Sequence, residues 1–399
     1  MTASSNLLIL GGRDSSVEWL SEIGCQADLI QSPSGVTDLQ RSAVNGLFLA
    51  DPADRGTIVD IAQRNHRRQP YRSIVTFQEP WLLAAAAVGE ALGVCWTPTA
   101  AIRTACDKAA TRDALRAAGI DTVRYRRCPT LADAQAFLAR AGAPIIVKPT
   151  GASGSRGVAL VGTADELGAA WARAAACADG AVIVEEYIEG PEFSVETISW
   201  LGRHEVLAVT EKTTSGPPGF VELGHVVPAS LPDADVEALS RLVVAVLDAI
   251  GHRSGPCHSE FRLSRTGPRV IETQTRPGGD QIWQLVQIAT GRNVFRETLA
   301  RLSGHPVDQA VCRQAGAAAI RFLAADRAGT VAALAGVAQA QASPGVVAVH
   351  LDVKAGDGVV VPASSSQRLG YVLAQADTPA EAVARAEAAR AMIGIGLGR

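Results

Sequence analysis

The sequence of 399 residues lacks the features that mark nucleic-acid-binding and membrane proteins. Its 37 lysines and arginines against 40 aspartates and glutamates give a net charge of −3, without the dense basic surface that nucleic-acid binding requires. We interpret the one dense basic cluster, residues 64–68, as the solvated end of a helix. The apolar run at residues 242–247 is far shorter than a membrane span. We therefore expect small-molecule partners, with no nucleic acid and no membrane.

Disulfide frameworks and targeting segments are also missing. The seven cysteines are an odd number, they are scattered, and none forms a Cys-x-x-Cys pair, which favours reduced thiols. The first six residues carry no basic segment, and the apolar run at residues 7–10 is too short for a signal-peptide core. We expect a cytoplasmic protein.

Two familiar phosphate-binding loops are absent from the most informative stretch, residues 145–158. Its lysine, Lys148, precedes the glycines, whereas a P-loop lysine follows them. Gly157 leads into an apolar segment that predicts a second strand, whereas a Rossmann glycine loop opens a helix. What is present is a strand that ends in Lys148, followed by a glycine loop with Ser153 and Ser155. A plain hairpin turn would also fit, but a lysine, N–H groups and hydroxyls together suit phosphate oxygens.

A further strand, residues 182–186, ends in the neighbouring acids Glu185 and Glu186. Acids at the end of a strand could face an adenine amine and ribose hydroxyls, which are hydrogen-bond donors. Together with the preceding glycine flap, this strand indicates a clamp around a nucleotide.

The pattern of apolar segments predicts an α/β protein with four parts. Strands and helices alternate over residues 1–100, which is typical of an open parallel sheet. Residues 101–210 carry the glycine flap and alternating strands, and are predicted to form an antiparallel α+β lid. Residues 211–314 begin with an irregular Gly/Pro-rich loop at 213–219 and are predicted to form a central α+β catalytic and metal-binding domain. We interpret the alanine-rich residues 315–399 as a separate small α+β module without an obvious catalytic cluster.

Two acids lie within predicted strands near the end of the third part. Glu260 and Glu272 each sit in an alternating pattern, so each side chain points to one face of its strand. If the strands are neighbours, the carboxylates can hold Mg²⁺ through hard oxygen ligands, and Gln274 on the same face could supply a third ligand. The alternative is two surface acids on an open sheet. Neighbouring carboxylates repel each other unless a cation joins them, which favours the metal.

Arg276 and two glycines, Gly278 and Gly279, follow this strand directly. An arginine and exposed N–H groups beside a metal site are the groups needed to stabilise an oxyanion during acyl transfer. A tight turn before a helix at residues 281–289, with Asp280 as the N-cap, explains the same sequence. Both interpretations can hold at once.

Taken in order, these motifs resemble the ATP-grasp superfamily over residues 100–310. The resemblance implies a site for ATP and two Mg²⁺ ions, with Mn²⁺ as a substitute. Lys108 and Lys148 would bind the α- and β-phosphates, and Glu192 would bind the ribose hydroxyls. Glu185 and the Ile188 backbone would face the adenine. The implied ATP contacts are Lys108, Lys148, Ser153, Ser155, Gly157, Glu185, Tyr187, Ile188, Glu192 and Lys212.

The same resemblance assigns the remaining motifs. Glu260 and Glu272 would carry the metal ions, and Arg276 and Gly279 would bind the acyl phosphate and the tetrahedral intermediate. Gln274 departs from the family, which has an asparagine there, and the longer amide would shift the second metal.

Within the superfamily the chain is most similar to the L-amino-acid ligase branch, which includes bacilysin-type dipeptide synthetases and carnosine synthase. Residues 220–228 are similar to the substrate segment of that branch, and residues 315–399 to its terminal domain. The acid Asp280 suggests a cationic amine partner. His225 could contact the substrate, or it could simply pack under the preceding loop. The implied substrate contacts are Glu222, His225, His258 and Asp280.

The resemblance implies an ADP-forming ligase that joins the carboxylate of an amino acid to an amine, in a dipeptide-type amide bond, through an acyl phosphate. One alternative is a ligase that uses a non-amino-acid carboxylate or acceptor. Another is a catalytically inactive nucleotide-binding regulator, against which the intact Glu260, Glu272 and Arg276 argue. The family suggests a role in dipeptide and antibiotic biosynthesis, and it allows a homodimer.

Overall fold

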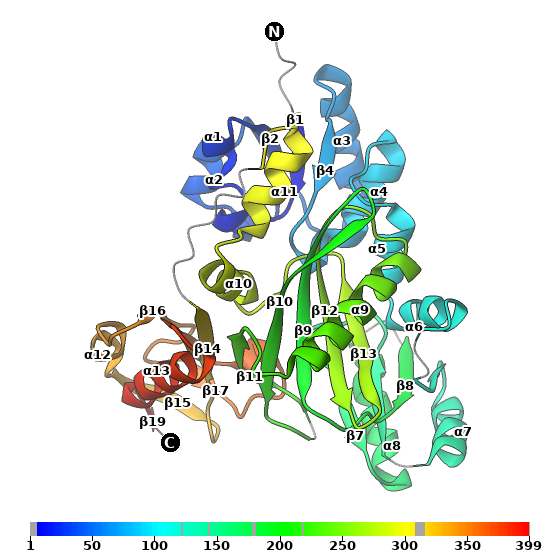
Figure 1. Cartoon of the computed structure of the whole chain (residues 1–399), viewed down its shortest axis with the longest axis vertical. Coiled ribbons are helices and arrows are strands. Elements are labelled where there is room, and N and C mark those ends of the chain that lie inside the picture. Colours follow the sequence, from blue (N-terminus) through cyan, green and yellow to red (C-terminus); the bar gives the residue numbers. More distant parts are fainter. Residues whose placement is uncertain are drawn as a thin grey trace.

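The computed structural model describes residues 6–120, 123–142, 144–177, 181–217, 219–307 and 316–398. Figure 1 shows an N-terminal α/β domain, a lid that carries α7 and α8, and a long central sheet with the C-terminal region at its side. Within the described ranges, no helix combines the length and apolar character needed to cross a bilayer.

The N-terminal domain is an open parallel sheet, as predicted. Its strands lie in the order β3-β2-β1-β4, and every pair is parallel. All five residues of β1 are buried, and four of them are apolar, because both faces of such a sheet are covered. The strands and helices are β1 (Asn6–Leu10), β2 (Gln26–Gln31), β3 (Gly46–Leu49), β4 (Ser73–Val75), α1 (Leu20–Ile23), α2 (Asp38–Ala43), α3 (Arg55–Arg68), α4 (Leu82–Leu92) and α5 (Thr99–Ala105).

The lid is an antiparallel sheet in the order β5-β8-β6-β7, and α7 and α8 share its hydrophobic core. The predicted flap is confirmed, since β6 and β7 pair antiparallel with Val147 opposite Ala159, and the glycine loop joins them. Helix α6 enters the lid after Asp107, whose carboxylate caps its first turn. The elements are α6 (Lys108–Ala117), β5 (Tyr125–Arg127), α7 (Leu131–Ala141), β6 (Ile145–Pro149), β7 (Ala159–Val161), α8 (Ala164–Ala176) and β8 (Val182–Glu186).

An eight-stranded sheet forms the centre of the molecule, in the order β13-β12-β9-β10-β11-β14-β18-β16. Helix α9 packs in one hydrophobic cluster with β9 and β12, and α10 packs in another with β11 and β14. Helix α11 returns to the N-terminal domain, where Phe295 and Leu299 join the core around β1. The elements are β9 (Glu192–Trp200), β10 (Arg203–Thr214), β11 (Glu222–Val227), α9 (Asp233–Ala249), β12 (Gly255–Ser264), β13 (Gly267–Gln274), α10 (Ile282–Thr290), α11 (Val294–Ser303), β14 (Ala317–Leu323), β16 (Val346–Leu351) and β18 (Gly370–Ala376).

The C-terminal region forms the small α+β module that was predicted, and part of it also joins the central sheet. Strand β14 pairs antiparallel with β11, so this region extends the central sheet. Without β14, β11 would expose an edge of unpaired N–H and C=O groups, which explains why the two regions join. A smaller sheet in the order β17-β15-β19 and two helices complete the region. These elements are β15 (Gly329–Ala335), α12 (Val337–Gln341), β17 (Gly358–Val359), α13 (Pro379–Met392) and β19 (Gly394–Gly398).

The irregular loop predicted at residues 213–219 starts two residues later than expected. Strand β10 continues through Thr214, with a shift of register at its end where it pairs with β11. A turn follows, in which the N–H of Phe220 donates to the carbonyl of Gly216 at 2.9 Å, and Pro218 lies outside the described residues. The strand runs on because β-branched threonines suit extended backbone.

Candidate active site

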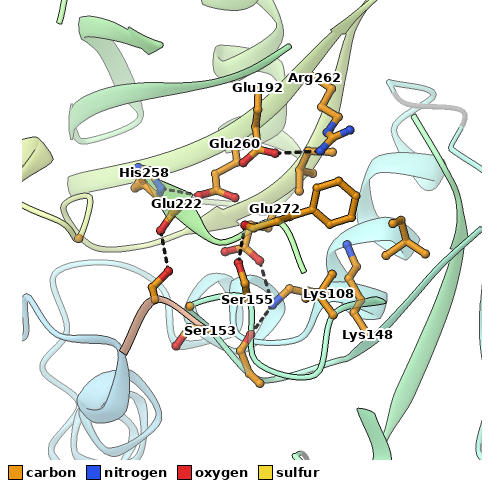
Figure 2. A pocket seen from close by; sticks show the side chains of 18 of the residues that line it. Lys108, Lys148, Ser153, Ser155, Glu192, Glu222, His258, Glu260, Arg262 and Glu272 are labelled. Carbon is orange, nitrogen blue, oxygen red and sulfur yellow. Dashed lines mark hydrogen bonds and ion pairs between the residues drawn. The ribbon is translucent and has the colours of Figure 1, made fainter. Parts of the chain in front are cut away.

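Two carboxylates face each other across the hairpin of β12 and β13. Glu260 and Glu272 are register partners, and both line a cavity of about 240 Å³ between the lid and the central sheet, the first cavity. Figure 2 shows them on adjacent strands, with Lys108 and Lys148 nearby on the lid side. The two strands are therefore neighbours, which is the arrangement that the metal-site interpretation requires.

Lys108 supplies a positive charge for Glu272. Its Nζ lies 2.9 Å from Glu272 Oε2 and donates to the carbonyl of Ala152 at 2.7 Å. Burial disfavours the charged lysine, but the attraction of Glu272 outweighs burial, so the pKa of Lys108 is raised. A charged ammonium thus stands between the strand acids and the glycine loop.

A second buried lysine compensates Glu260. Lys212 Nζ contacts the carboxylate of Glu260, and it lies 2.7 Å from Glu222 and 3.3 Å from Glu192. Burial opposes its charge, yet the three acids together hold the pKa of Lys212 well above its ordinary value. Since its ammonium is enclosed by acids and does not line the first cavity, direct contact with a phosphate remains a prediction.

His258 gives Glu260 a second positive neighbour. Its Nδ1 donates to Glu196 at 2.7 Å and its Nε2 donates to Glu260 at 3.1 Å. Burial alone would lower the pKa of His258, but Glu196 and Glu260 raise it to about 10. Burial would raise the pKa of Glu260, but Lys212 and His258 hold it well below its ordinary value. The sequence did not predict Glu196 as a site residue, although Glu196 lies on the same face of β9 as Glu192.

These carboxylates fit a divalent cation. Glu260 and Glu272 present hard oxygen ligands to one space, and Glu260 is held in its ionised form. Gln274 is buried two residues beyond Glu272, and its Oε1 has no hydrogen-bond partner among the described residues. An acceptor oxygen without a donor beside two acids suits a cation. Gln274 does not line the first cavity, so its part as a ligand remains a prediction.

Lys148 and Glu185 form part of the lid wall. Lys148 Nζ lies 2.7 Å from Glu185, which also accepts two hydrogen bonds from Arg112 at 2.7 and 3.2 Å. Burial would raise the pKa of Glu185, but Arg112 and Lys148 lower it to about 2. Burial lowers the pKa of Lys148 despite its attraction to Glu185. The carboxylate of Glu185 therefore anchors two cations, and Arg112 is a site residue that the sequence did not reveal.

The glycine loop divides into a part at the cavity and a part packed behind it. Ser153 and Ser155 line the first cavity, and the Ser155 hydroxyl donates to the carbonyl of Phe220 at 3.1 Å. Gly157 lies outside the cavity lining. Its φ is +73°, and a Cβ there would lie 3.1 Å from Cys177 Sγ. Glycine at this position therefore serves the backbone and the close packing against α8.

Two rings and a guanidinium form the far end of the first cavity. Tyr187 and Ile188 line it, and Arg262 donates to the Tyr187 hydroxyl and the Ile188 carbonyl, both at 3.0 Å. Arg262 lies over the rings of Tyr187 and Phe220, at 5.2 and 5.0 Å, and reaches Glu192 at 3.3 Å. Such flat groups offer a surface for a planar base. Arg262 was also not predicted as a site residue, although alternation along β12 places it on the same face as Glu260.

The loop after β13 joins the central sheet to the N-terminal domain. Arg276 Nη2 lies 2.6 Å from Glu79, and although burial opposes its charge, Glu79 raises the pKa of Arg276. A Cβ on Gly279 would have no heavy atom within 4 Å, so its backbone is open to the first cavity. A Cβ on Gly278 would lie 3.0 Å from Glu196, so this glycine is packed and lines an adjoining cavity instead.

Asp280 is not the N-cap of the following helix, which corrects the sequence interpretation. Helix α10 begins after Gln281, whose side chain makes no capping bond. Asp280 instead accepts two hydrogen bonds from Arg368, at 2.5 and 2.7 Å. Burial is outweighed by Arg368, so the pKa of Asp280 lies well below its ordinary value. A bidentate charged pair is stronger than a single capping bond to a backbone N–H, and it offsets the charge on which a cationic amine partner was suggested.

The C-terminal region reaches the first cavity with Ser365 as well, although no functional cluster was expected there. The Ser365 hydroxyl donates to Glu222 at 3.2 Å, and its N–H donates to the carbonyl of Gly154 at 3.2 Å. Burial raises the pKa of Glu222. Beside it, His225 is buried with Nε2 3.5 Å from Asp280, and its Nδ1 has no partner within the described part of the chain.

Most of the site residues predicted from the sequence share the first cavity. Those that do not line it are Gly157, Lys212, His225, Gln274 and Gly278. Those that line it are Lys108, Lys148, Ser153, Ser155, Glu185, Tyr187, Ile188, Glu192, Glu222, His258, Glu260, Glu272, Arg276, Gly279 and Asp280.

Comparison with known proteins gives two family matches and several relatives. Residues 141–284 match the ATP-grasp domain, and residues 321–398 match the L-amino acid ligase C-terminal domain 2. Protein y4rH of Sinorhizobium fredii, which is uncharacterized, is 34% identical over 291 residues, covering 70% of this chain and 59% of that protein. The alanine–anticapsin ligase of Bacillus subtilis is 28% identical over 257 residues, covering 58% of this chain and 52% of that protein.

The fold also has solved counterparts. The L-amino acid ligase from Bacillus licheniformis superposes with a TM-score of 0.85 and 24% identity, and each chain is covered completely. This likeness shows a shared fold. The chain spans 59% and 52% of the lengths of the two curated relatives above.

Proposed function

This chain belongs to the ATP-grasp superfamily, in its L-amino acid ligase branch, and we propose that it is an ADP-forming ligase that joins the carboxylate of one amino acid to the amine of another. The observation that carries the proposal is the pairing of Glu260 with Glu272 on a cavity shared with Lys108 and Lys148. Paired carboxylates opposite paired lysines are what a metal-bound triphosphate needs.

ATP would lie along the first cavity. Its base would rest by Tyr187 and the Ile188 backbone, and its ribose hydroxyls would face Glu192. Its phosphates would accept hydrogen bonds from Lys108, Lys148 and the Ser153–Ser155 part of the flap. Binding an anion here would draw Lys108 and Lys148 away from the acids that hold them at 2.9 and 2.7 Å.

The metal site follows from the strand acids. Glu260 and Glu272 would hold Mg²⁺, or Mn²⁺ in its place, with Gln274 as an added ligand, and the bound metal would neutralise phosphate charge and orient the γ-phosphate. His258 and Lys212 hold Glu260 ionised for this purpose.

The first chemical step is attack of the donor carboxylate oxygen on the γ-phosphorus of ATP. The bond between that phosphorus and the β-bridging oxygen breaks, ADP leaves, and an acyl phosphate forms. Water must be kept out because it would hydrolyse this product. Contacts of the flap with Phe220 and Ser365 close the cavity on one side.

The second step is attack of the neutral acceptor amine on the acyl carbon. The carbonyl oxygen gains negative charge, and Arg276 with the open N–H of Gly279 would stabilise it. Phosphate then leaves with the electron pair of its C–O bond, the nitrogen loses a proton, and an amide remains. No cysteine is needed for this route, and burial raises the pKa of the Cys106 thiol to about 12.

The substrate class rests on the family. One relative is named for joining alanine to anticapsin, which supports amino-acid substrates here. Glu222 and Asp280, which line the first cavity, would contact the donor amino acid, and the buried His225 lies beside Asp280.

The test is ADP release from ATP and Mg²⁺ with pairs of amino acids, followed by mass spectrometry of the products. We expect release that requires amino acids, with phosphate and a dipeptide formed in equal amounts. No ADP with any pair would favour a nucleotide-binding regulator, and ADP release that responds only to other carboxylates or amines would favour the alternative ligase.

A further inference from the structure

A second cavity of about 300 Å³ adjoins the first, between the N-terminal domain and the loop after β13. The two cavities share Glu79, Arg276, Gly279 and Asp280 in their linings. Arg276 and the open backbone of Gly279 are the proposed oxyanion groups, so a ligand in the second cavity would lie beside the acyl carbon. Its volume is in the range of small-molecule sites.

The charges around the second cavity leave one cation without a partner. Glu79 is bound by Arg276 at 2.6 Å, and Asp280 is bound by Arg368 at 2.5 Å. Arg13 lines the cavity, and within the described residues its guanidinium has no hydrogen bond or ion pair. The cavity therefore carries an uncompensated positive charge, which favours an anionic group on the ligand.

Part of the lining of the second cavity is aromatic. Phe77, Trp283 and Phe295 line it, and the ring centroid of Phe295 lies 4.9 Å from that of Phe77 and 5.1 Å from that of Trp283. Both contacts are edge-to-face, so the rings support one another as a rigid surface. Such a surface favours an apolar or aromatic side chain over a charged one.

We propose that the second cavity binds the acceptor substrate as an amino acid, with its α-carboxylate on Arg13 and an apolar side chain against Phe77, Trp283 and Phe295. The free amine then points across Arg276 and Gly279 toward the acyl carbon in the first cavity. This inference rests on the proposed function, because it names the substrate class of the second half-reaction. The product would be a dipeptide with a free carboxyl end and an apolar C-terminal residue.

The experiment separates the two halves of the reaction. Hydroxylamine, a small amine, traps acyl phosphates as hydroxamates and has no carboxylate, so it reports donor activation alone. The proteinogenic amino acids are first scanned as donors with hydroxylamine, ATP and Mg²⁺. The best donor is then used with L-phenylalanine or L-phenylalaninamide as acceptor, and KM for each acceptor is measured in the wild type, Arg13→Lys and Arg13→Gln.

A charge-assisted hydrogen bond predicts that L-phenylalanine has a KM roughly ten- to a hundredfold below that of its amide in the wild type. In Arg13→Gln the KM values of L-phenylalanine and its amide become similar, because only the carboxylate of L-phenylalanine loses a charged partner. Arg13→Lys retains part of the preference. Arg41→Gln, which removes an exposed arginine of α2 outside every cavity described, is the matched control and keeps the wild-type preference.

Several outcomes would overturn the inference while the proposed function stands. Equal KM values for acid and amide in the wild type would show that the carboxylate is not bound. An equal rise for both acceptors in Arg13→Gln would show a merely structural role. A rise in the donor KM of the hydroxamate reaction would assign the second cavity to the donor. Absence of hydroxamate with every donor would instead contradict the proposed function itself.

Discussion

Arg368 and Asp280 are joined by two hydrogen bonds of 2.5 and 2.7 Å, although 88 residues separate them in the sequence. Asp280 and its neighbour Gln281 have φ values of 51° and 61°, a region that non-glycine residues rarely adopt. Arg368 lies 3.6 Å above the ring centroid of Phe322 and is itself fixed there. The C-terminal region thus holds the loop that carries Gly279 in a strained conformation.

The first prediction concerns this ion pair. Arg368→Met leaves Asp280 buried without its partner and frees the loop, so we expect kcat to fall by roughly tenfold or more with little change in KM for ATP. Steady-state ADP release measures both constants. Arg385→Met, an exposed arginine of α13, is the matched control and should leave kcat unchanged. Equal kcat in the two variants would show that the pair does not position the loop.

The second prediction concerns the metal. Glu272→Gln keeps the shape of the side chain but removes one charge of the paired acids, so we expect turnover to fall by about a hundredfold or more. Circular dichroism should show a retained fold, and the remaining activity should need more Mg²⁺. Glu237→Gln, on the exposed side of α9, controls for the loss of a charge. Wild-type turnover in Glu272→Gln at ordinary Mg²⁺ would contradict the metal site.

The third prediction concerns pH. The pKa of His258 is about 10 in the folded chain and close to 6.5 when unfolded, so its folded-state value is raised. The stability that it contributes is fully present below about pH 6.5 and is lost as pH rises toward 10. Urea unfolding at pH 6, 8 and 10 should show a decline that His258→Gln reduces. A decline of the same size in His258→Gln would assign it to other groups.

The fourth prediction concerns the buried triad of Arg112, Glu185 and Lys148. Arg112→Met removes the larger of the two attractions on a buried carboxylate, so we expect the free energy of unfolding to fall by about 3 kcal/mol. The shift of the urea midpoint measures this loss. Arg116→Met, on the exposed face of the same helix, breaks a surface pair with Asp113 and a cation–π contact with Tyr125, and should cost less than about 1 kcal/mol. Equal shifts of the urea midpoint in the two variants would mean that the triad contributes no more to stability than a surface pair.

The sequence predicted the parts of the site that local periodicity determines. Alternation along a strand places Glu260 and Glu272 on defined faces, and a lysine before a glycine loop predicts a flap. The resemblance then ordered these motifs into one site, and the neighbouring register of β12 and β13 agrees.

The local sequence contained no indication of the residues that pair with these site residues. Glu79, Arg112 and Arg368 come from distant segments, and only the folded chain brings them to Arg276, Glu185 and Asp280. The N-cap assignment of Asp280 failed for the same reason, since a charged partner from the C-terminal region outcompeted a bond within its own helix. The joining of β14 to β11 was equally invisible, because strand pairing depends on which edge is left open.

The most direct test is a crystal structure with a non-hydrolysable ATP analogue and Mn²⁺, located by anomalous scattering. We expect manganese within about 2.0–2.6 Å of carboxylate oxygens from Glu260 and Glu272, in contact with the terminal phosphates as well. Phosphates bound elsewhere, or manganese beyond reach of both residues, would contradict this expectation.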